Sequence, residues 1–379
     1  MYIKYTEDKK YLLQVANEIK KLTQKINKIK KANDNIIFTI GSTADSTKFS
    51  KPYLTPVRKI DNAYVFGIII YTQCQSIIFS SIVDGKVDYI FVDAEKKLPL
   101  LKNPDYSPLK SFKIKVDNLT ISKYEFGNIS AICNNFVQIS KLHLFKGNDL
   151  TVETTWFFLV NYFKELSGKK FLIIGAGNIG SKLALKLVES GAKIVLVPKK
   201  NSKSTIASSI NKIKQKSLLS KILVSHSKVK AAINCDAILG CTNLVPVING
   251  QMVNAMNKNG VVIDVGKENL TNDGLKAIQD TGIYTWRADI SPMIQSMVTA
   301  AQKMKNFYKN YYGRTQQNNF FLVSGGYIGN KYDIIVDNHN NPKFILGICD
   351  GKGSVFKTYN KIAKANLDKI KIMIKVNSK

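Results

Sequence analysis

A glycine-rich turn, Gly175 to Gly180 (GAGNIG), holds the residues whose spacing is most specific for a known chemistry. A short apolar run, Phe171 to Ile174, precedes the turn, and apolar residues at helical spacing follow it. In such a strand, turn and helix, the first glycine permits the tight bend, the second admits a pyrophosphate, and the third lets helix and strand lie close. We predict that a dinucleotide binds at the amides that open this helix. The residues are Gly175, Ala176, Gly177, Asn178, Ile179 and Gly180.

The next strand, expected over 192–197, ends in residues that bear on the choice of cofactor. A ribose with a free 2′-hydroxyl is normally held by an Asp or Glu about 20 residues beyond the glycines. No carboxylate stands there. The chain continues instead with cations and a hydroxyl that suit a 2′-phosphate: Lys199, Lys200, Ser202 and Lys203. We therefore predict NADP(H) in preference to NAD(H), the alternative being that these lysines form only a solvated surface.

Two further apolar runs, CDAILGC and GVVIDVG, read as buried strands. The first is followed by Thr242 and Asn243, and the second ends with Val265 and Gly266. Because ligands bind at the carboxyl ends of strands in open parallel sheets, we expect these four residues to flank the nicotinamide. A helix between the two runs and a last strand over 283–286 continue the alternation of a doubly wound sheet.

Residues 150–180 and the strand ends CTN and IDVG resemble the two-domain dehydrogenases that include shikimate dehydrogenase, methylenetetrahydrofolate dehydrogenase and glutamyl-tRNA reductase. The stretch VPKKNSK is similar to the NADP-reading Asn-Arg-Thr loop of shikimate dehydrogenases. The likeness covers about 140 of the 379 residues. It implies an α/β protein with a Rossmann-type doubly wound parallel sheet at 151–290. The resemblance places a separate N-terminal α/β substrate domain at 1–150. The residue pattern beyond the likeness predicts a return helix and a β-rich C-terminal extension at 291–379.

The resemblance also implies a polar cluster that opens the long helix before the nucleotide domain, and Asp149 and Thr151 are the matching residues. Thr151 lies 24 residues before Gly175, which is similar to the spacing of the family's key polar residue. The chain departs from the family because it has no Asn-Thr-Asp and no Pro-Cys-Thr-Pro. Asp149 and Thr151 therefore either contact the substrate, cap the helix, or do both.

A lysine of the N-terminal domain is the expected proton-transfer partner, and our candidate is Lys96. Residues 82–93 read as a hairpin whose turn is Asp84 and Gly85, and its second strand ends among acids and lysines next to Lys96. Neighbouring charges or burial can bring a lysine pKa toward the working pH. With 56 Lys and Arg residues in the chain, an ordinary surface lysine is the alternative.

A hydroxyl-rich loop, GSTADSTKFSKPYLTP over 41–56, supplies the candidate substrate contacts Ser46, Ser50 and Lys51. Shikimate dehydrogenases hold a substrate carboxylate with a serine-containing loop at a similar place, although their histidine is missing here. The alternative is an ordinary polar turn.

Composition favours a globular protein of the reduced cytoplasm. The chain is 45% apolar, and its longest apolar run, 63–71, is too short to cross a bilayer. No secretory signal is recognisable at the N-terminus. The five cysteines show neither metal-ligand spacing nor a disulfide pattern, so we expect no metal. Cys133 followed by Asn134 is similar to the nucleophile motif of glutamyl-tRNA reductase, but its position favours a core cysteine within a strand.

The formal charge of +29 would attract polyanions such as RNA or a phosphorylated substrate. The lysines are dispersed, however, and those of 20–31 lie on the wet face of an amphipathic helix. We therefore favour an oxidoreductase with a small anionic hydroxy, oxo or imine substrate. The alternative is a dinucleotide-bound regulatory or RNA-associated protein without turnover. A homodimer is compatible with either.

The last 89 residues lie beyond the resemblance. Ser291 and Pro292 begin a helix with one apolar face that Gly313 ends. Three short runs, 320–323, 332–337 and 343–349, then predict an antiparallel sheet, and a lysine-rich helix over 359–375 follows.

Overall fold

The computed structural model describes residues 9–42, 51–95, 98, 127–198 and 205–377. Seven predicted site residues lie outside these ranges: Ser46, Ser50, Lys96, Lys199, Lys200, Ser202 and Lys203. The chain divides into two compact units, Met1–Gln295 and Ser296–Lys379. The predicted division of the first unit near residue 150 stays a prediction, although separate hydrophobic cores lie on its two sides.

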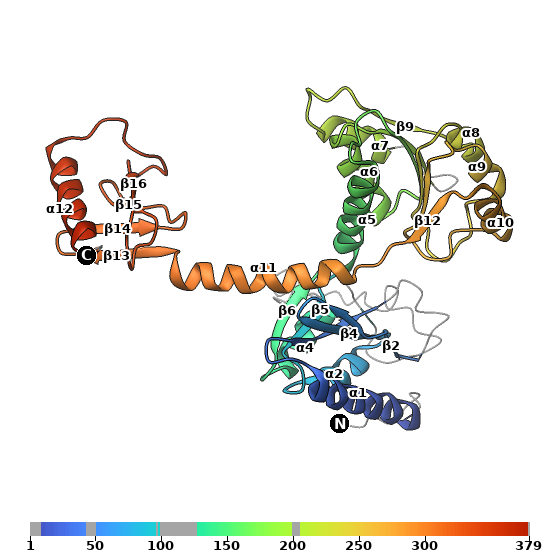
Figure 1. Ribbon diagram of the computed structural model, residues 1–379, viewed down its shortest axis with the longest axis horizontal. Helices are drawn as coiled ribbons and strands as arrows, with labels where there is room; N and C mark the ends of the chain where they lie inside the picture. Colours follow the sequence, from blue (N-terminus) through green and yellow to red (C-terminus); the bar gives the residue numbers. More distant parts are fainter. Residues whose placement is uncertain (1–8, 43–50, 96–97, 99–126, 199–204, 378–379) are drawn as a thin grey trace, which may run out of the picture. The chain divides into compact units, whose positions relative to one another are not determined.

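The sheet that contains the glycine turn has six strands, all parallel, in the order β12-β11-β10-β7-β8-β9. Figure 1 labels its two edge strands, β9 and β12. The order reverses between β7 and β10, which makes this pair of strands the topological switch point of a Rossmann-type doubly wound sheet. The predicted fold class is therefore confirmed. The strands are β7 (Lys170–Ile174), β8 (Lys193–Val197), β9 (Ile222–Val224), β10 (Ala237–Gly240), β11 (Val261–Asp264) and β12 (Tyr284–Arg287).

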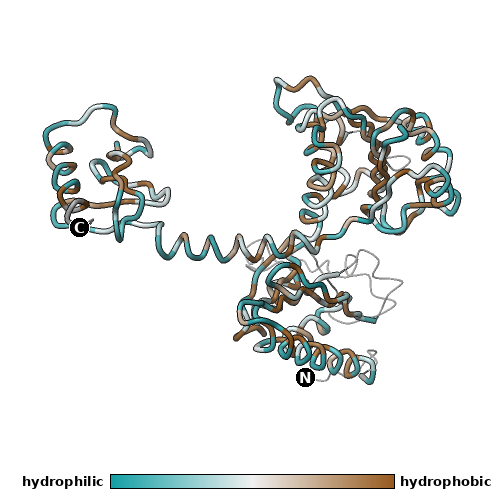
Figure 2. The backbone as a smooth tube through the Cα atoms, viewed as in Figure 1, coloured by the Kyte–Doolittle hydropathy of each residue, from teal (hydrophilic) through white to brown (hydrophobic). Residues whose placement is uncertain are grey.

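Helices cover both faces of this sheet, because successive strand residues point to opposite faces. Phe171 and Ile173 of β7 pack into one core with α5 and α6, while Leu172 and Ile174 pack into the other with α8, α9 and α10. The strands are accordingly hydrophobic along their length (Figure 2). The helices are α5 (Gly147–Phe163), α6 (Asn178–Glu189), α7 (Thr205–Ile213), α8 (Lys228–Ala232), α9 (Gly250–Asn254) and α10 (Asn272–Thr281).

The N-terminal half contains a second sheet, in the order β2-β4-β1-β5-β6 with β3 paired to β4. Its three central pairings join β4, β1, β5 and β6 in parallel, so the carboxyl ends of these strands share one edge. The elements are α1 (Lys9–Ile29), β1 (Asn35–Gly41), β2 (Tyr53–Leu54), β3 (Arg58–Ile60), β4 (Ala63–Ile69), α2 (Gln73–Val83), β5 (Tyr89–Asp93), α4 (Ile129–Phe136) and β6 (Lys141–Phe145).

The hairpin predicted over 82–93 is wrong. Val83 ends helix α2, and β5 pairs in parallel with β1 instead of antiparallel with a preceding strand. Thr72 caps α2 by accepting a hydrogen bond from the Gln75 amide at 3.1 Å. Asp84 does not build a two-residue turn, because its carboxylate accepts amide hydrogen bonds from the segment before β6, including Ser140 at 2.7 Å.

Cys133 lies in helix α4 and not in a strand, which corrects a second prediction. Asn128 caps this helix, since its side-chain oxygen accepts from the Ser130 amide at 2.9 Å. The thiol of Cys133 is fully buried in the N-terminal core, as expected for a core cysteine.

The second unit is a four-stranded sheet, β13-β14-β15-β16, with α12 packed on it. The two outer pairings are antiparallel, but β14 and β15 are parallel, so the sheet is mixed and the antiparallel prediction is wrong there. The connection over 325–333 is too long for a hairpin turn and returns the chain to the start of β14. The elements are α11 (Ser291–Asn310), β13 (Gly313–Gln317), β14 (Phe320–Ser324), β15 (Ile334–Val336), β16 (Ile345–Ile348) and α12 (Lys361–Asn377).

Among the helices in the described parts of the chain, none combines the length and the apolar character needed to span a bilayer.

Candidate dinucleotide site

Backbone contacts fix two of the three glycines in the turn between β7 and α6. Gly175 has φ 104°, and a Cβ there would lie 2.8 Å from the carbonyl oxygen of Cys241. A Cβ at Gly180 would lie 1.9 Å from the carbonyl oxygen of Gly175. Side chains at either position would therefore push α6 away from the sheet or distort the turn. These are the roles that the spacing of the glycines predicts.

The middle glycine differs, because no atom lies within 4 Å of the position that a Cβ of Gly177 would take. Gly177 is the N-cap of α6, has φ −79°, and provides no side-chain hydrogen bond to the first turn. The first amides of a helix have no partner within the helix. Open space thus lies beside Asn178, Ile179 and the start of the helix, where an anion is favoured by the amides and by the helix dipole.

The strand ends predicted to flank the nicotinamide lie against this turn. A Cβ on Gly266 would be 1.8 Å from the Thr242 carbonyl oxygen, so the ends of β10 and β11 touch. Asn243 is exposed, whereas the side chain of Val265 is buried in the core of the domain. The structure therefore brings together the glycine turn, Thr242 and Gly266, and any cofactor contact of Val265 would come from its backbone.

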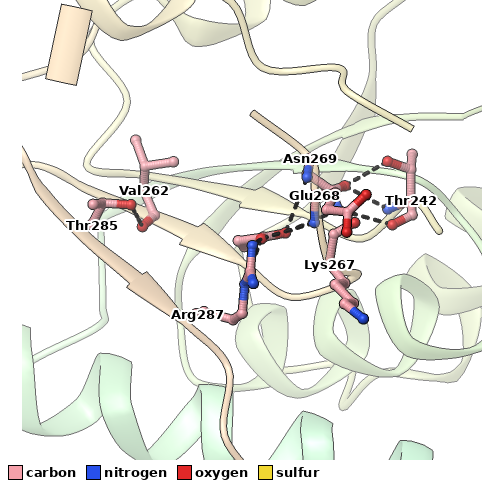
Figure 3. A network of polar contacts seen from close by, with 8 residues as sticks. Thr242, Val262, Lys267, Glu268, Asn269, Thr285 and Arg287 are labelled. Carbon is pink, nitrogen blue, oxygen red and sulfur yellow. Dashed lines mark hydrogen bonds and ion pairs between the residues drawn. The ribbon is translucent and has the colours of Figure 1, made fainter. Parts of the chain in front are cut away.

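Asn269, which the sequence reading missed, holds the ends of β10 and β11 together (Figure 3). Its side-chain oxygen accepts from the Thr242 amide at 3.0 Å, and its side-chain nitrogen donates to the Thr242 carbonyl at 2.9 Å. The same nitrogen donates to Asp264 Oδ1 at 3.0 Å. Asn269 is fully buried, so these bonds satisfy its own amide group and join the ends of both strands. No local pattern marks such an asparagine, because its partners lie up to 27 residues away.

Asp264, at the end of β11, is the second part of this network. Its carboxylate accepts from the Glu268 amide at 3.0 Å and pairs with Arg287 at 2.9 Å (Figure 3). In the loop that follows Asp264, Lys267 and Glu268 both have positive φ, at 74° and 57°. Two consecutive non-glycine residues in this conformation are strained, and such strain concentrates at functional sites. The loop is thus held in a costly shape beside the glycine turn.

A charged cluster links the start of α5 to the start of α6. Lys182 of α6 pairs with Asp149 and lies 3.5 Å from Glu95, while Lys146 pairs with Asp149 at 2.8 Å. Glu95 follows β5 and also accepts from the Asn148 amide at 3.2 Å. Burial raises the pKa of Asp149, but hydrogen bonds from Lys146 and Lys182 outweigh it, so the pKa lies below its ordinary value. Asp149 is therefore ionised at neutral pH.

Neither Asp149 nor Thr151 caps α5, so the capping alternative is wrong for both. The N-cap residue is Lys146, and its side chain makes no capping hydrogen bond. Asp149 lies within the first turn of α5, where the helix dipole stabilises a negative charge. The Thr151 hydroxyl donates to the Gly147 carbonyl at 2.9 Å.

The remaining candidates contribute less to the site. Lys51 lies over the Tyr11 ring, 4.8 Å from its centroid, in a cation–π contact. Burial raises the pKa of the Cys133 thiol to about 12, which excludes it as a nucleophile at neutral pH. Across the described residues, no group of three or more His, Cys, Asp or Glu side chains could hold a metal ion.

Comparison with known proteins agrees with this description. The family described as "NADP oxidoreductase coenzyme F420-dependent" matches residues 170–267, the glycine turn included. This match covers well under half of the chain. No curated protein has a sequence that matches it.

Several solved structures are similar at low identity. Ornithine carbamoyltransferase from Pyrococcus furiosus is 12% identical over 76% of this chain and 91% of its own, with a TM-score of 0.41. L-tryptophan dehydrogenase from Nostoc punctiforme is 10% identical over 72% and 75%, with a TM-score of 0.37. Dipicolinate synthase A chain from Bacillus subtilis is 13% identical over 73% and 99%, with a TM-score of 0.31. The family match and the strand order together identify the Rossmann-type fold of NAD(P) oxidoreductases.

Proposed function

We propose that this protein is an NADP-linked oxidoreductase that transfers hydride between the nicotinamide and a small, polar, anionic hydroxy, oxo or imine substrate. The glycine turn carries the proposal. Gly175 and Gly180 are fixed by backbone contacts, whereas Gly177 opens onto free space at the start of α6. This is the geometry that admits a diphosphate at the switch point of the sheet.

The preference for NADP(H) rests on charge at the end of β8. The sequence has no Asp or Glu between Glu189 and Asp236, so this segment offers no carboxylate to a ribose 2′-hydroxyl. The same segment contains ten lysines, among them the predicted phosphate contacts Lys199, Lys200 and Lys203. A 2′-phosphate would be attracted to this segment, and the resemblance to shikimate dehydrogenases agrees with that assignment.

The charged cluster supports a substrate site beside the start of α6. Lys96 directly follows Glu95 in the sequence, and Glu95 lies 3.5 Å from Lys182. Asp149 is ionised and cannot donate a proton at neutral pH, so its role would be to orient cations and a substrate hydroxyl. In this proposal a lysine, with Lys96 as the candidate, donates the proton to the oxygen that becomes a hydroxyl. The cofactor, when bound, supplies the hydride.

Consumption of NADPH with a panel of 2-oxo acids, dehydroshikimate and cyclic imines tests the proposal. We expect one class of substrate to be reduced, with NADPH used in preference to NADH. Binding of NADPH without turnover of any member would favour the regulatory alternative. Tighter binding of NADH than of NADPH would overturn the cofactor assignment and leave the fold assignment intact.

A further inference from the structure

Five exposed aromatic rings, which we call the aromatic ladder, lie together in the second unit. They come from the last turns of α11, from the residues after it and from the loop between β14 and β15. Their exposed fractions run from 36% to 57%, although rings of this size are normally buried. The ladder consists of Phe307, Tyr308, Tyr311, Tyr312 and Tyr327.

The rings of the ladder are neighbours in space. The centroids of Tyr308 and Tyr312 are 5.4 Å apart, and those of Tyr312 and Tyr327 are 5.6 Å apart. The first pair crosses at 76° and the second at 57°. Phe307 and Tyr311 stack at 22° with centroids 6.4 Å apart, so each shields one face of the other, whereas in a crossed pair the edge of one ring shields one face of its partner only. Tyr308 and Tyr312 are nevertheless 57% and 40% exposed, so ring faces stay open to solvent. A planar group can therefore stack on the ladder.

Cations surround the ladder without being neutralised. Lys303, Lys305 and Lys309 alternate with the rings in the sequence KMKNFYKNYYGR, and none of the three forms an ion pair with a described residue. Between Asp289 and Asp333 the sequence has no acidic residue. Residues 296–379 contain 14 Lys and Arg against four Asp and no Glu. The surface is thus both aromatic and strongly positive.

Arg314 differs from these lysines, because its guanidinium is paired with a carboxylate of the same unit. Its guanidinium is bidentate to Asp333, at 2.8 and 3.0 Å, and it stacks on Phe321 at 3.4 Å from the centroid. The positive charge of Arg314 is therefore paired within the unit and stabilises its fold. The lysines of α11 have no such role.

We propose that the aromatic ladder binds single-stranded nucleic acid, with bases stacked on the rings and phosphates drawn to the neighbouring lysines. Exposed rings beside unpaired cations are the features by which single strands are held without sequence preference. A second copy of this chain would bring the same positive charge to the surface. A duplex would hide its base faces. The ladder consists of residues of the second unit and the glycine turn of residues of the first, and occupancy of the ladder does not depend on the proposed reaction.

Fluorescence anisotropy with the full chain and labelled oligo(U) and oligo(dT) of about twelve nucleotides tests the proposal. We expect both strands to bind more tightly than a duplex of the same length. Combined Tyr308→Leu and Tyr312→Leu should weaken binding by about tenfold or more, since each stacked base contributes substantially. Tyr308→Phe with Tyr312→Phe should bind like the wild type, because the ring faces remain.

Matched controls separate the ladder from general charge. Tyr284→Leu, an exposed tyrosine of β12 in the first unit, should leave oligonucleotide affinity unchanged. Lys309→Gln should reduce the salt dependence of binding, by about one phosphate contact, while Lys371→Gln on α12 should not. NADPH affinity should be the same in all of these variants, and an unchanged thermal unfolding profile should show that the second unit remains folded.

Four outcomes would overturn the proposal. One is equal affinity of the leucine variant and the wild type. A second is equal binding of heparin and of single strands with no effect of the rings. A third is a dimer in light scattering that the leucine substitutions dissociate, because a second copy then covers the ladder. The last is binding to phosphatidylserine vesicles with no binding of oligonucleotides.

Discussion

The first unit presents two sheets with parallel central strands whose ends carry polar residues, and these two edges are built in different ways. At the nucleotide sheet, backbone contacts determine the shape. A Cβ at Gly180 would lie 1.9 Å from the Gly175 carbonyl oxygen, and the buried Asn269 side chain joins the ends of two strands by hydrogen bonds. At the N-terminal sheet, long charged side chains from three segments meet, and Lys182 and Asp149 are each more than a third exposed. The first edge is rigid by construction, whereas the second is held by ion pairs that water screens.

The difference indicates a division of labour. A diphosphate needs fixed amides, which a strained turn and a buried network provide. A proton-transfer site needs charges whose pKa values depend on their neighbours, which a cluster of lysines and carboxylates provides. The predictions below test the two edges separately.

The largest effect is expected at the substrate edge from Lys96→Met. If Lys96 donates the proton, its loss should lower kcat by about a hundredfold or more, because general acid catalysis contributes that much. NADPH affinity should be unchanged, as measured by fluorescence titration. The adjacent Lys97→Met is the matched control and should retain turnover. Similar kcat values for the two variants would remove Lys96 from the mechanism.

The strongest effect on folding is expected from Gly180→Ala. The added Cβ would meet the Gly175 carbonyl oxygen at 1.9 Å, so helix and strand must separate. We expect a loss of about 3 kcal/mol in the free energy of unfolding, at the upper end of the usual cost of overpacking. Gly177→Ala, three residues earlier, should cost little because open space surrounds it. Urea denaturation of the two variants makes the comparison, and equal losses would contradict the described turn.

Asn269→Ala should destabilise the same edge by about 2 kcal/mol, because it leaves buried partners without hydrogen bonds. The affected groups are the Thr242 amide and carbonyl, whereas the Asp264 carboxylate keeps its bonds from the Glu268 amide and Arg287. Asn243→Ala is the control, since Asn243 is exposed and its loss should change stability by less than about 0.5 kcal/mol. If thermal unfolding shows no difference between them, Asn269 does not hold the loops together.

The smallest effect is expected from Lys182→Met. The folded pKa of Asp149 lies below its ordinary value of 3.8, so its contribution to stability is present above that pH and is lost as the pH falls through the folded pKa. The variant should raise this pKa, seen by NMR titration of the carboxyl carbon. At pH 6 it should cost less than about 1 kcal/mol, because both partners are partly exposed. Lys371→Met, which removes an exposed pair with Asp368, should have no measurable effect. An unshifted Asp149 pKa would mean that Lys182 does not pair with it in solution.

The two edges also differ in how far the sequence could predict them. The glycine turn could be predicted because the spacing of its glycines is local in the sequence, and the strands at its sides are continuous apolar runs. The hairpin predicted at the N-terminal sheet was wrong because residues 82–83 are apolar, and apolar residues fit a buried helix as well as a buried strand. Asp84 looked like a turn residue, although its partners lie more than 50 residues away. Asn269 was missed for the same reason, since its role depends on distant neighbours.

The account depends most on a diphosphate bound at the open middle glycine, and calorimetric titration of NADPH into wild-type protein and Gly177→Val tests this directly. We predict that the wild type binds NADPH and that the variant loses affinity by about a hundredfold or more, because its side chain fills the space of the phosphates. Its thermal unfolding should match that of the wild type. Equal affinities, or no binding of NADPH to the wild type, would contradict the account.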